Sequence, residues 1–133
     1  MKIIIIFLLG TLATYAQLTI TVSPPKMVGQ KAVVLLAMKN GLNEKVESAR
    51  AAVFLLDEQG KMVGQATKWV IGGNQDKSAL AVGATNSFHF VVTGDKPFST
   101  TNLSAKITFS RVVLENGKLA DVAKQVTVKQ AGE

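Results

Sequence analysis

The sequence contains no cysteine, and it has only one histidine and one tryptophan among 133 residues. The absence of thiols excludes disulfides, cysteine-ligated zinc, blue-copper sites and cysteine nucleophiles. The fold must therefore be stabilised by packing and by backbone pairing.

Groups that carry catalysis are equally scarce. Serine-type nucleophilic catalysis needs a base for the hydroxyl proton, and His89 lies in the middle of a predicted strand with no G-x-S-x-G motif in the chain. The nine acidic residues are scattered and offer no pair for glycoside hydrolysis. Gly72-Gly73 lacks the lysine and the helix of a phosphate-binding loop. We therefore predict no enzymatic activity, no catalytic residue and no cofactor, and an enzyme stays only as a less favoured alternative that would need His89 beside a methionine or a carboxylate in one cleft.

A soft metal site would need its ligands close together. Met27, Met38 and Met62 with His89 have the chemistry for Cu(I), but they are widely spaced, and methionine in an apolar strand is usually core filler. The single adjacent acidic pair, Asp57-Glu58, fits a hairpin tip better than a calcium site. We predict no metal-ligating residue, with a metal-binding module kept as an alternative.

The start of the chain predicts export. Lys2 is followed by an apolar run from Ile3 to Leu9 and then by a cleavage-site pattern with small residues that ends at Ala16. This order is typical of a secretory signal peptide. A membrane-spanning helix needs about 20 apolar residues, more than this run provides. We predict a leader over 1–16, a mature domain over 17–133, and an extracytoplasmic location, periplasmic or secreted. After cleavage no stable membrane insertion is expected.

The chain carries 15 basic and 9 acidic residues, for a net charge of +6. Its lysines are dispersed along the sequence and form no basic run, which argues against a nucleic-acid partner. Weak attraction to an acidic polysaccharide or a lipid headgroup stays open, because net charge supports only non-specific association.

Turn residues recur about every ten positions, between runs rich in valine, threonine, isoleucine and phenylalanine, as in all-β sandwiches. We predict an all-β, immunoglobulin-like β-sandwich of about seven or eight antiparallel strands in one domain. Its main strands are expected at Leu18–Val22, Lys31–Met38, Ala49–Leu56, Lys61–Val70, Phe88–Val92, Leu103–Leu114 and Leu119–Val128.

Two turns can be specified further. Asp57 to Gly60 fits a type I turn followed by a left-handed glycine, with the Asp57 carboxylate accepting bonds from the turn amides. Asn116-Gly117 predicts a two-residue hairpin between Leu103–Leu114 and Leu119–Val128. The segment Ala49–Leu56 is apolar on both faces, so we expect it to be covered on both sides.

The stretch Val53-Phe54-Leu55-Leu56-Asp57, followed by Gly60, resembles the signature region of FxLYD domains, which are small immunoglobulin-like modules of exported prokaryotic proteins. Val53 stands where that family has phenylalanine, and Leu56 where it has tyrosine. Further similarities are found at Gly83 with Phe88 and Phe90, and at Met38-Lys39-Asn40. The resemblance implies a β-sandwich and an extracytoplasmic setting, and it carries no catalytic residue.

Trp69 is the candidate contact residue. An exposed indole anchors protein partners or stacks on sugar rings, whereas its alternation with Lys68 favours a place inside the sandwich. A carbohydrate-binding module would need Trp69 and Phe98 in a flat row. Our main hypothesis is a non-catalytic domain in protein binding or structural support, whose partner is another extracytoplasmic protein or a second copy, recruited through sheet edges.

Overall fold

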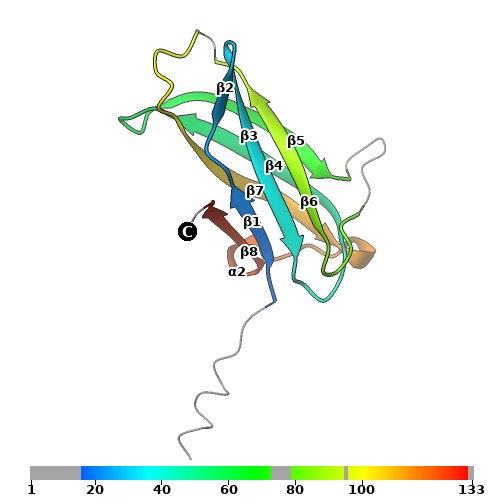
Figure 1. Cartoon of the computed structure of the whole chain (residues 1–133). Coiled ribbons are helices and arrows are strands. Elements are labelled where there is room, and N and C mark those ends of the chain that lie inside the picture. The colour runs from blue at the N-terminus through cyan, green and yellow to red at the C-terminus, as the bar shows by residue number, and fades with distance from the viewer. Residues whose placement is uncertain (1–15, 73–78, 95, 132–133) are drawn as a thin grey trace, which may run out of the picture.

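The computed structural model describes residues 16–72, 79–94 and 96–131, and they form an all-β sandwich of two sheets (Figure 1). The predicted all-β fold is confirmed, with eight strands in the described residues. The predicted leader lies outside the described residues except for Ala16. Gly73 and the five residues after it lie outside them as well.

Sheet A is built around β3, which has β6 along one edge and β1 and β2 along the other. Pro24 and Pro25 separate β1 from β2, because proline lacks the amide hydrogen that a ladder needs. β8 lies beside β1 at the other side of the sheet. The strands are β1 (Leu18–Val22), β2 (Lys26–Val28), β3 (Lys31–Asn40), β6 (Thr85–Val92) and β8 (Val126–Gln130).

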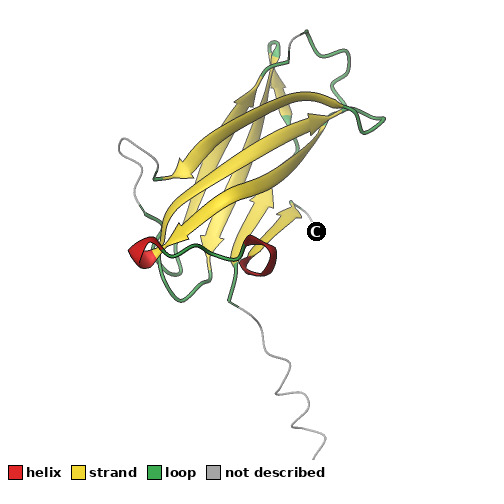
Figure 2. Ribbon diagram, turned by 180° about the vertical axis from the view of Figure 1, so that it is seen from behind, coloured by secondary structure: helices red, strands yellow, loops and turns green. Residues whose placement is uncertain are grey.

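Sheet B has three long strands in the order β5-β4-β7, all antiparallel. Figure 2 shows the molecule from behind, with η1 and α2 as short helical turns at one end. The elements are β4 (Val46–Leu56), β5 (Met62–Ile71), β7 (Ser104–Leu114), η1 (Glu115–Gly117) and α2 (Val122–Gln125).

The core lies between the sheets and follows from strand alternation. Leu18, Ile20 and Val22 are fully buried while the threonines between them are only half-buried, because successive strand side chains point to opposite faces. Phe90 and Val92 are buried on β6, because residues two positions apart on a strand share a face.

Asn40 is the one buried polar side chain among the described residues. Its amide nitrogen donates to the carbonyl oxygens of Glu44 and Leu80, each at 3.0 Å, and its Oδ1 accepts from the Leu42 amide at 2.9 Å. A buried amide with all these bonds is tolerated in a core, since burial is costly only for unsatisfied polar groups. Asn40 thereby ties the β3–β4 connection to the segment before β6.

The turn after β4 forms as predicted. Gly60 has a φ of 81° and its amide donates to the Asp57 carbonyl at 3.0 Å. The Asp57 carboxylate accepts from the amides of Gln59 and Lys61, each at 2.9 Å. Glycine is required there because a side chain is strained at positive φ.

The second predicted hairpin is only partly correct. Asn116 and Gly117 both have positive φ, 62° and 77°, as the expected turn demands. The returning arm is short: the Ala120 amide bonds to the Val112 carbonyl, and the chain then leaves sheet B through α2. The predicted strand over 119–128 is therefore wrong: Leu119 forms a single bridge with Val113, and the strand that follows is Val126–Gln130.

The chain end also departs from the expected all-antiparallel pairing. β8 runs parallel to β1, with Leu18 opposite Val126 and Val22 opposite Gln130. The reason is topological, since β7 ends in sheet B and the crossover through α2 brings the chain into sheet A in the same direction as β1. A hairpin return would have kept β8 in sheet B.

Candidate binding surface

The outer face of sheet B carries the candidate site. On β4 the inward side chains Ala51, Val53 and Leu55 are fully buried, so the alternate positions point outward. We call this surface the arginine face. It comprises Arg50, Ala52, Phe54 and Leu56 of β4, Gln65, Thr67 and Trp69 of β5, and Lys106, Thr108, Ser110 and Arg111 of β7.

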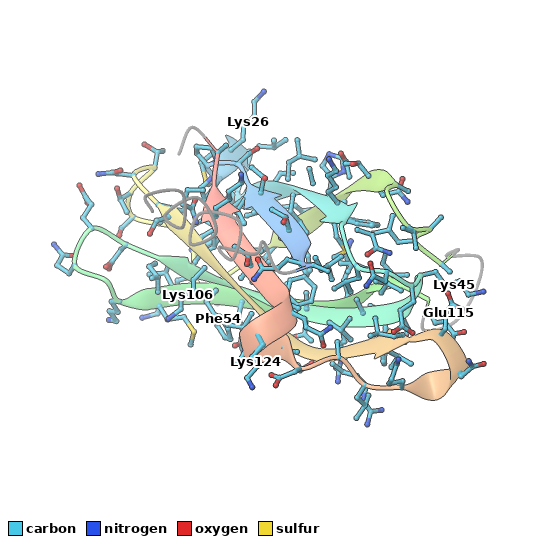
Figure 3. All side chains as sticks on the ribbon, turned by 90° about the horizontal axis from the view of Figure 1, so that it is seen from below. Lys26, Lys45, Phe54, Lys106, Glu115 and Lys124 are labelled. Atoms are coloured by element: carbon cyan, nitrogen blue, oxygen red, sulfur yellow. The ribbon has the colours of Figure 1, made fainter. Side chains whose placement is uncertain are left out.

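The expectation that Ala49–Leu56 is covered on both sides is wrong. β4 is paired along both edges, but Phe54 and Leu56 are only half-buried on the outer side. Figure 3 shows Phe54 and Lys106 side by side on this surface, consistent with their opposite positions in the ladder. The arginine face therefore presents apolar side chains at its centre.

Trp69 lies on the arginine face and not inside the sandwich. It is half-buried and stands opposite exposed Arg50 in the β4–β5 ladder. Lys68 takes the inward position instead: its Nζ donates to the His89 carbonyl of β6 and lies 5.0 Å from the centre of the Phe90 ring. A lysine reaches from an inward position at a sheet edge because its stem is apolar and its ammonium extends beyond the core.

Arg50 and Arg111, the two arginines of the chain, are partners in the β4–β7 ladder, and both are exposed. The ladder shifts register beside them, and the extra residue Ser110 has its hydroxyl 3.5 Å from the Arg50 carbonyl oxygen. Side chains directly opposite on one face have their Cβ atoms about 5 Å apart. The β-bulge thus brings two guanidinium groups onto the same side of the sheet.

None of the residues that make up the arginine face is acidic. β5 and β7 contain no acidic residue, and the one acidic residue of β4 is Glu47, three positions before Arg50. Within residues 16–72, 79–94 and 96–131, no carboxylate forms an ion pair with Arg50 or Arg111. The ion pair that is present, between Lys118 and Glu44 at 2.7 Å, joins the η1 end of the molecule to the β3–β4 connection.

The sheet edges are partly guarded. Lys68 bonds to the His89 carbonyl at the edge of β6. Gly94 lies close against the edge of β5, since a Cβ added to this glycine would be 2.7 Å from the Val63 carbonyl oxygen. On β7 the Val112 carbonyl is taken by Ala120, and Gln130 Nε2 lies 3.4 Å from the Ala105 carbonyl. Such covers are a common protection against strand addition. Parts of the sheet edges, which the sequence favoured for partner binding, are thus covered. We therefore place the candidate site on the outer face of sheet B.

The candidate metal residues are not brought together. Met38 is in the core and Met27 pairs with Ala32, six positions from Met38 along β3 or about 20 Å. Met62 belongs to the other sheet, and His89 is exposed opposite Leu35. Within the described part of the chain, no group of three histidine, cysteine or acidic residues is positioned to hold a metal ion.

The aromatic row required for a carbohydrate platform is not formed by Trp69 and Phe98. The Phe98 ring packs beside Gly64 of β5, 3.6 Å from where a Cβ on that glycine would lie. Gly64 is five residues before Trp69, which places the two about 16 Å apart along the strand. Phe98 also lines an open depression of about 420 Å³ with Met62 and Pro97. This depression is therefore at the opposite end of β5 from Trp69.

The residues that carry the FxLYD resemblance have structural positions. Val53 and Leu55 are buried, Asp57 and Gly60 form the turn, and Gly83 has a φ of 80° just before β6. Each of these positions is explained by packing or by turn geometry.

No family model matches the chain, and no curated protein matches it. Among solved structures, it is similar to the crystal structure of a Bordetella pertussis protein described as ApaA. The two are 19% identical with a TM-score of 0.54, and the match covers 80% of this chain and 89% of that one. At this identity the likeness shows the fold alone. The resemblance to FxLYD domains stays a prediction.

We also find that no helix among the described residues has the length and apolar character to cross a bilayer.

Proposed function

We propose that this protein is an exported, non-catalytic immunoglobulin-like domain that binds another extracytoplasmic protein through the arginine face. The observation that carries the proposal is the juxtaposition of half-buried Trp69 with exposed Arg50 on the outer face of sheet B, over which the strands of residues 16–72, 79–94 and 96–131 form no further sheet. Tryptophan and arginine are the residue types most enriched at binding hot spots.

The make-up of the surface supports this function. Apolar side chains of β4 such as Phe54 lie at the centre, and exposed polar side chains such as Thr67 and Lys106 flank them. Protein interfaces share this arrangement, with a water-excluded centre and a polar rim. None of the described depressions is centred on the arginine face, so this face suits a protein surface better than a small molecule, which needs a concave pocket.

The proposal of a non-catalytic role is supported by the dispersal of reactive groups. His89 is on sheet A, on the side of the sandwich away from the arginine face, and its ladder partner is Leu35. General acid–base or nucleophilic catalysis would need a second polar group within hydrogen-bond reach of this imidazole. No such bond to the His89 ring is formed within residues 16–72, 79–94 and 96–131.

Capture from an extracytoplasmic extract tests the function with matched surfaces. The immobilised full chain is compared with Trp69→Ala and with Leu35→Ala, a control on the outer face of sheet A where the leucine is 38% exposed. We expect the wild type and Leu35→Ala to retain the same protein and Trp69→Ala to lose it. Circular dichroism of each variant verifies that the fold is kept.

Two results would contradict the proposal. One is capture that Trp69→Ala leaves unchanged, which would assign binding to another surface. The other is a wild-type chain that retains no protein and is monomeric in sizing experiments, which would leave the arginine face without a protein partner.

A further inference from the structure

We infer that the partner of the arginine face is an acidic protein surface, with a carboxylate seated between the guanidinium groups of Arg50 and Arg111. This inference rests on the proposed function and specifies the chemistry of the partner. Its starting point is the ladder pairing of the two arginines on one face.

The pairing of Arg50 with Arg111 has an electrostatic cost. Two like charges placed directly opposite in a sheet repel each other and lower stability. Arg50 and Arg111 keep this arrangement with no ion pair to a carboxylate of residues 16–72, 79–94 and 96–131. A bound carboxylate would convert the repulsion into two charge-assisted hydrogen-bonded contacts.

The two paired cations are arginines and not lysines. Lysine is the common cation of this chain, and both arginines are on the same surface. The guanidinium group is a planar fork that binds a carboxylate through two parallel bonds, whereas an ammonium acts as a point charge. The arginine pair therefore favours a planar carboxylate over a diffuse anionic field.

The positive charge of the arginine face continues beyond the arginine pair. Lys106, on the same side of β7 as Arg111, stands opposite Phe54 and is exposed. From Lys106 to Arg111 the positive groups follow the strand for about 16 Å, so more than one acidic residue of a partner can be accommodated. Charge complementarity of this kind selects partners and speeds their encounter.

A protein is favoured over an acidic polysaccharide by the aromatic residues. Stacking on a chain of sugar rings would use a row of exposed aromatic side chains, and Phe98 lies far from Trp69 on β5. The half-buried Phe54 and Leu56 instead provide an apolar centre. Apolar side chains of a protein partner pack on such a centre, as they do in the water-excluded core of protein interfaces.

The test is a nuclear magnetic resonance titration of the full chain that follows the backbone amides and the arginine side-chain Nε–H signals. The probe is the peptide acetyl-Glu-Val-Glu-Val-Glu-amide, and its matched control has glutamine at each glutamate. We expect the acidic peptide to shift the Arg50 and Arg111 signals, and the glutamine peptide to shift them at least about tenfold less at equal concentration.

Matched variants separate the site from net charge. Arg50→Gln with Arg111→Gln removes two charges from the face, and Lys31→Gln with Lys129→Gln removes two from exposed positions in sheet A. We expect the arginine pair to weaken peptide binding about tenfold or more and the lysine pair to weaken it by less than about twofold. Arg50→Lys with Arg111→Lys keeps the charge and serves if the glutamine variant does not fold. It is expected to bind several-fold more weakly than wild type.

Equal weakening by the arginine and lysine variants would overturn the inference, since binding would then depend on net charge alone. So would saturable binding of polygalacturonate at the same signals without binding of the peptide, because the partner would then be an acidic polysaccharide. In the capture experiment, retention of a partner by the arginine variant but not by Trp69→Ala would sink this inference while the proposed function stands.

Discussion

The side-chain amide of Asn40 donates to the carbonyl oxygen of Leu80 at 3.0 Å, across 40 positions of the chain. The bond is buried. The same side chain also donates to the Glu44 carbonyl oxygen and accepts from the Leu42 backbone amide. One side chain therefore holds together the end of β3, the loop after it and the segment that leads into β6.

We predict that Asn40→Ala lowers the free energy of unfolding by about 3 kcal/mol, because the Leu42 amide and the carbonyls of Glu44 and Leu80 each lose a hydrogen bond at a buried position. Urea denaturation followed by circular dichroism measures the change. Asn43→Ala, in the same loop but exposed, is the control and is expected to change stability by less than about 0.5 kcal/mol. A similar loss for both variants would mean that the network is not the cause.

The Asp57 turn gives a second stability prediction. Asp57→Ala removes the acceptor of the Gln59 and Lys61 amides, and we expect a loss of about 1 kcal/mol in the free energy of unfolding. Gln59→Ala keeps both backbone bonds and is expected to be close to neutral. Thermal unfolding of the two variants in parallel tests this, and a neutral Asp57→Ala would show that the carboxylate is dispensable for the turn.

Lys68 is predicted to limit self-association. Lys68→Met keeps the apolar stem but removes the group that bonds to the His89 carbonyl at the β6 edge. We expect the variant to associate increasingly as its concentration rises in sedimentation experiments, since an uncovered edge accepts another strand. Lys39→Met, which removes an exposed charge from the central strand β3, should stay like the wild type. Indistinguishable sedimentation of the two variants would count against an edge-guarding role.

The leader prediction has a direct chemical readout. Gln17 is the first residue in the described contacts: its carbonyl accepts from the Gly41 amide at 2.9 Å, and its side chain bonds to Thr127 and to the Lys124 carbonyl. Cleavage after Ala16 would keep all of these bonds. We expect mass spectrometry of an extracytoplasmic fraction to find a chain that begins at Gln17. Recovery of the intact chain from the cytosol with residues 1–16 attached would refute export.

Much of the fold was predictable because its causes are local. Period-two alternation located the buried faces of β1 and β6, and Asp57 with Gly60 specified a turn that depends on only five residues. The short hairpin arm was not predictable in this way. Whether the chain after Asn116-Gly117 pairs with β7 or crosses to β1 is decided by contacts more than 100 positions apart.

The site was predictable only in part. Trp69 could be singled out from its residue type, but its orientation depended on Lys68, whose inward position is possible because β5 is an edge strand close to β6. The Arg50–Arg111 pair could not be found from spacing, since 61 positions and a β-bulge separate the two residues. Ladder register, which a single sequence does not specify across a long connection, is the missing information.

The pairing of β1 with β8 has a consequence for biogenesis. Because β1 receives its outer neighbour from β8, a growing polypeptide has an incomplete sheet A until β8 has emerged. Completion of sheet A is thereby delayed until the last strand has been synthesised, although β1 and β3 can pair before that.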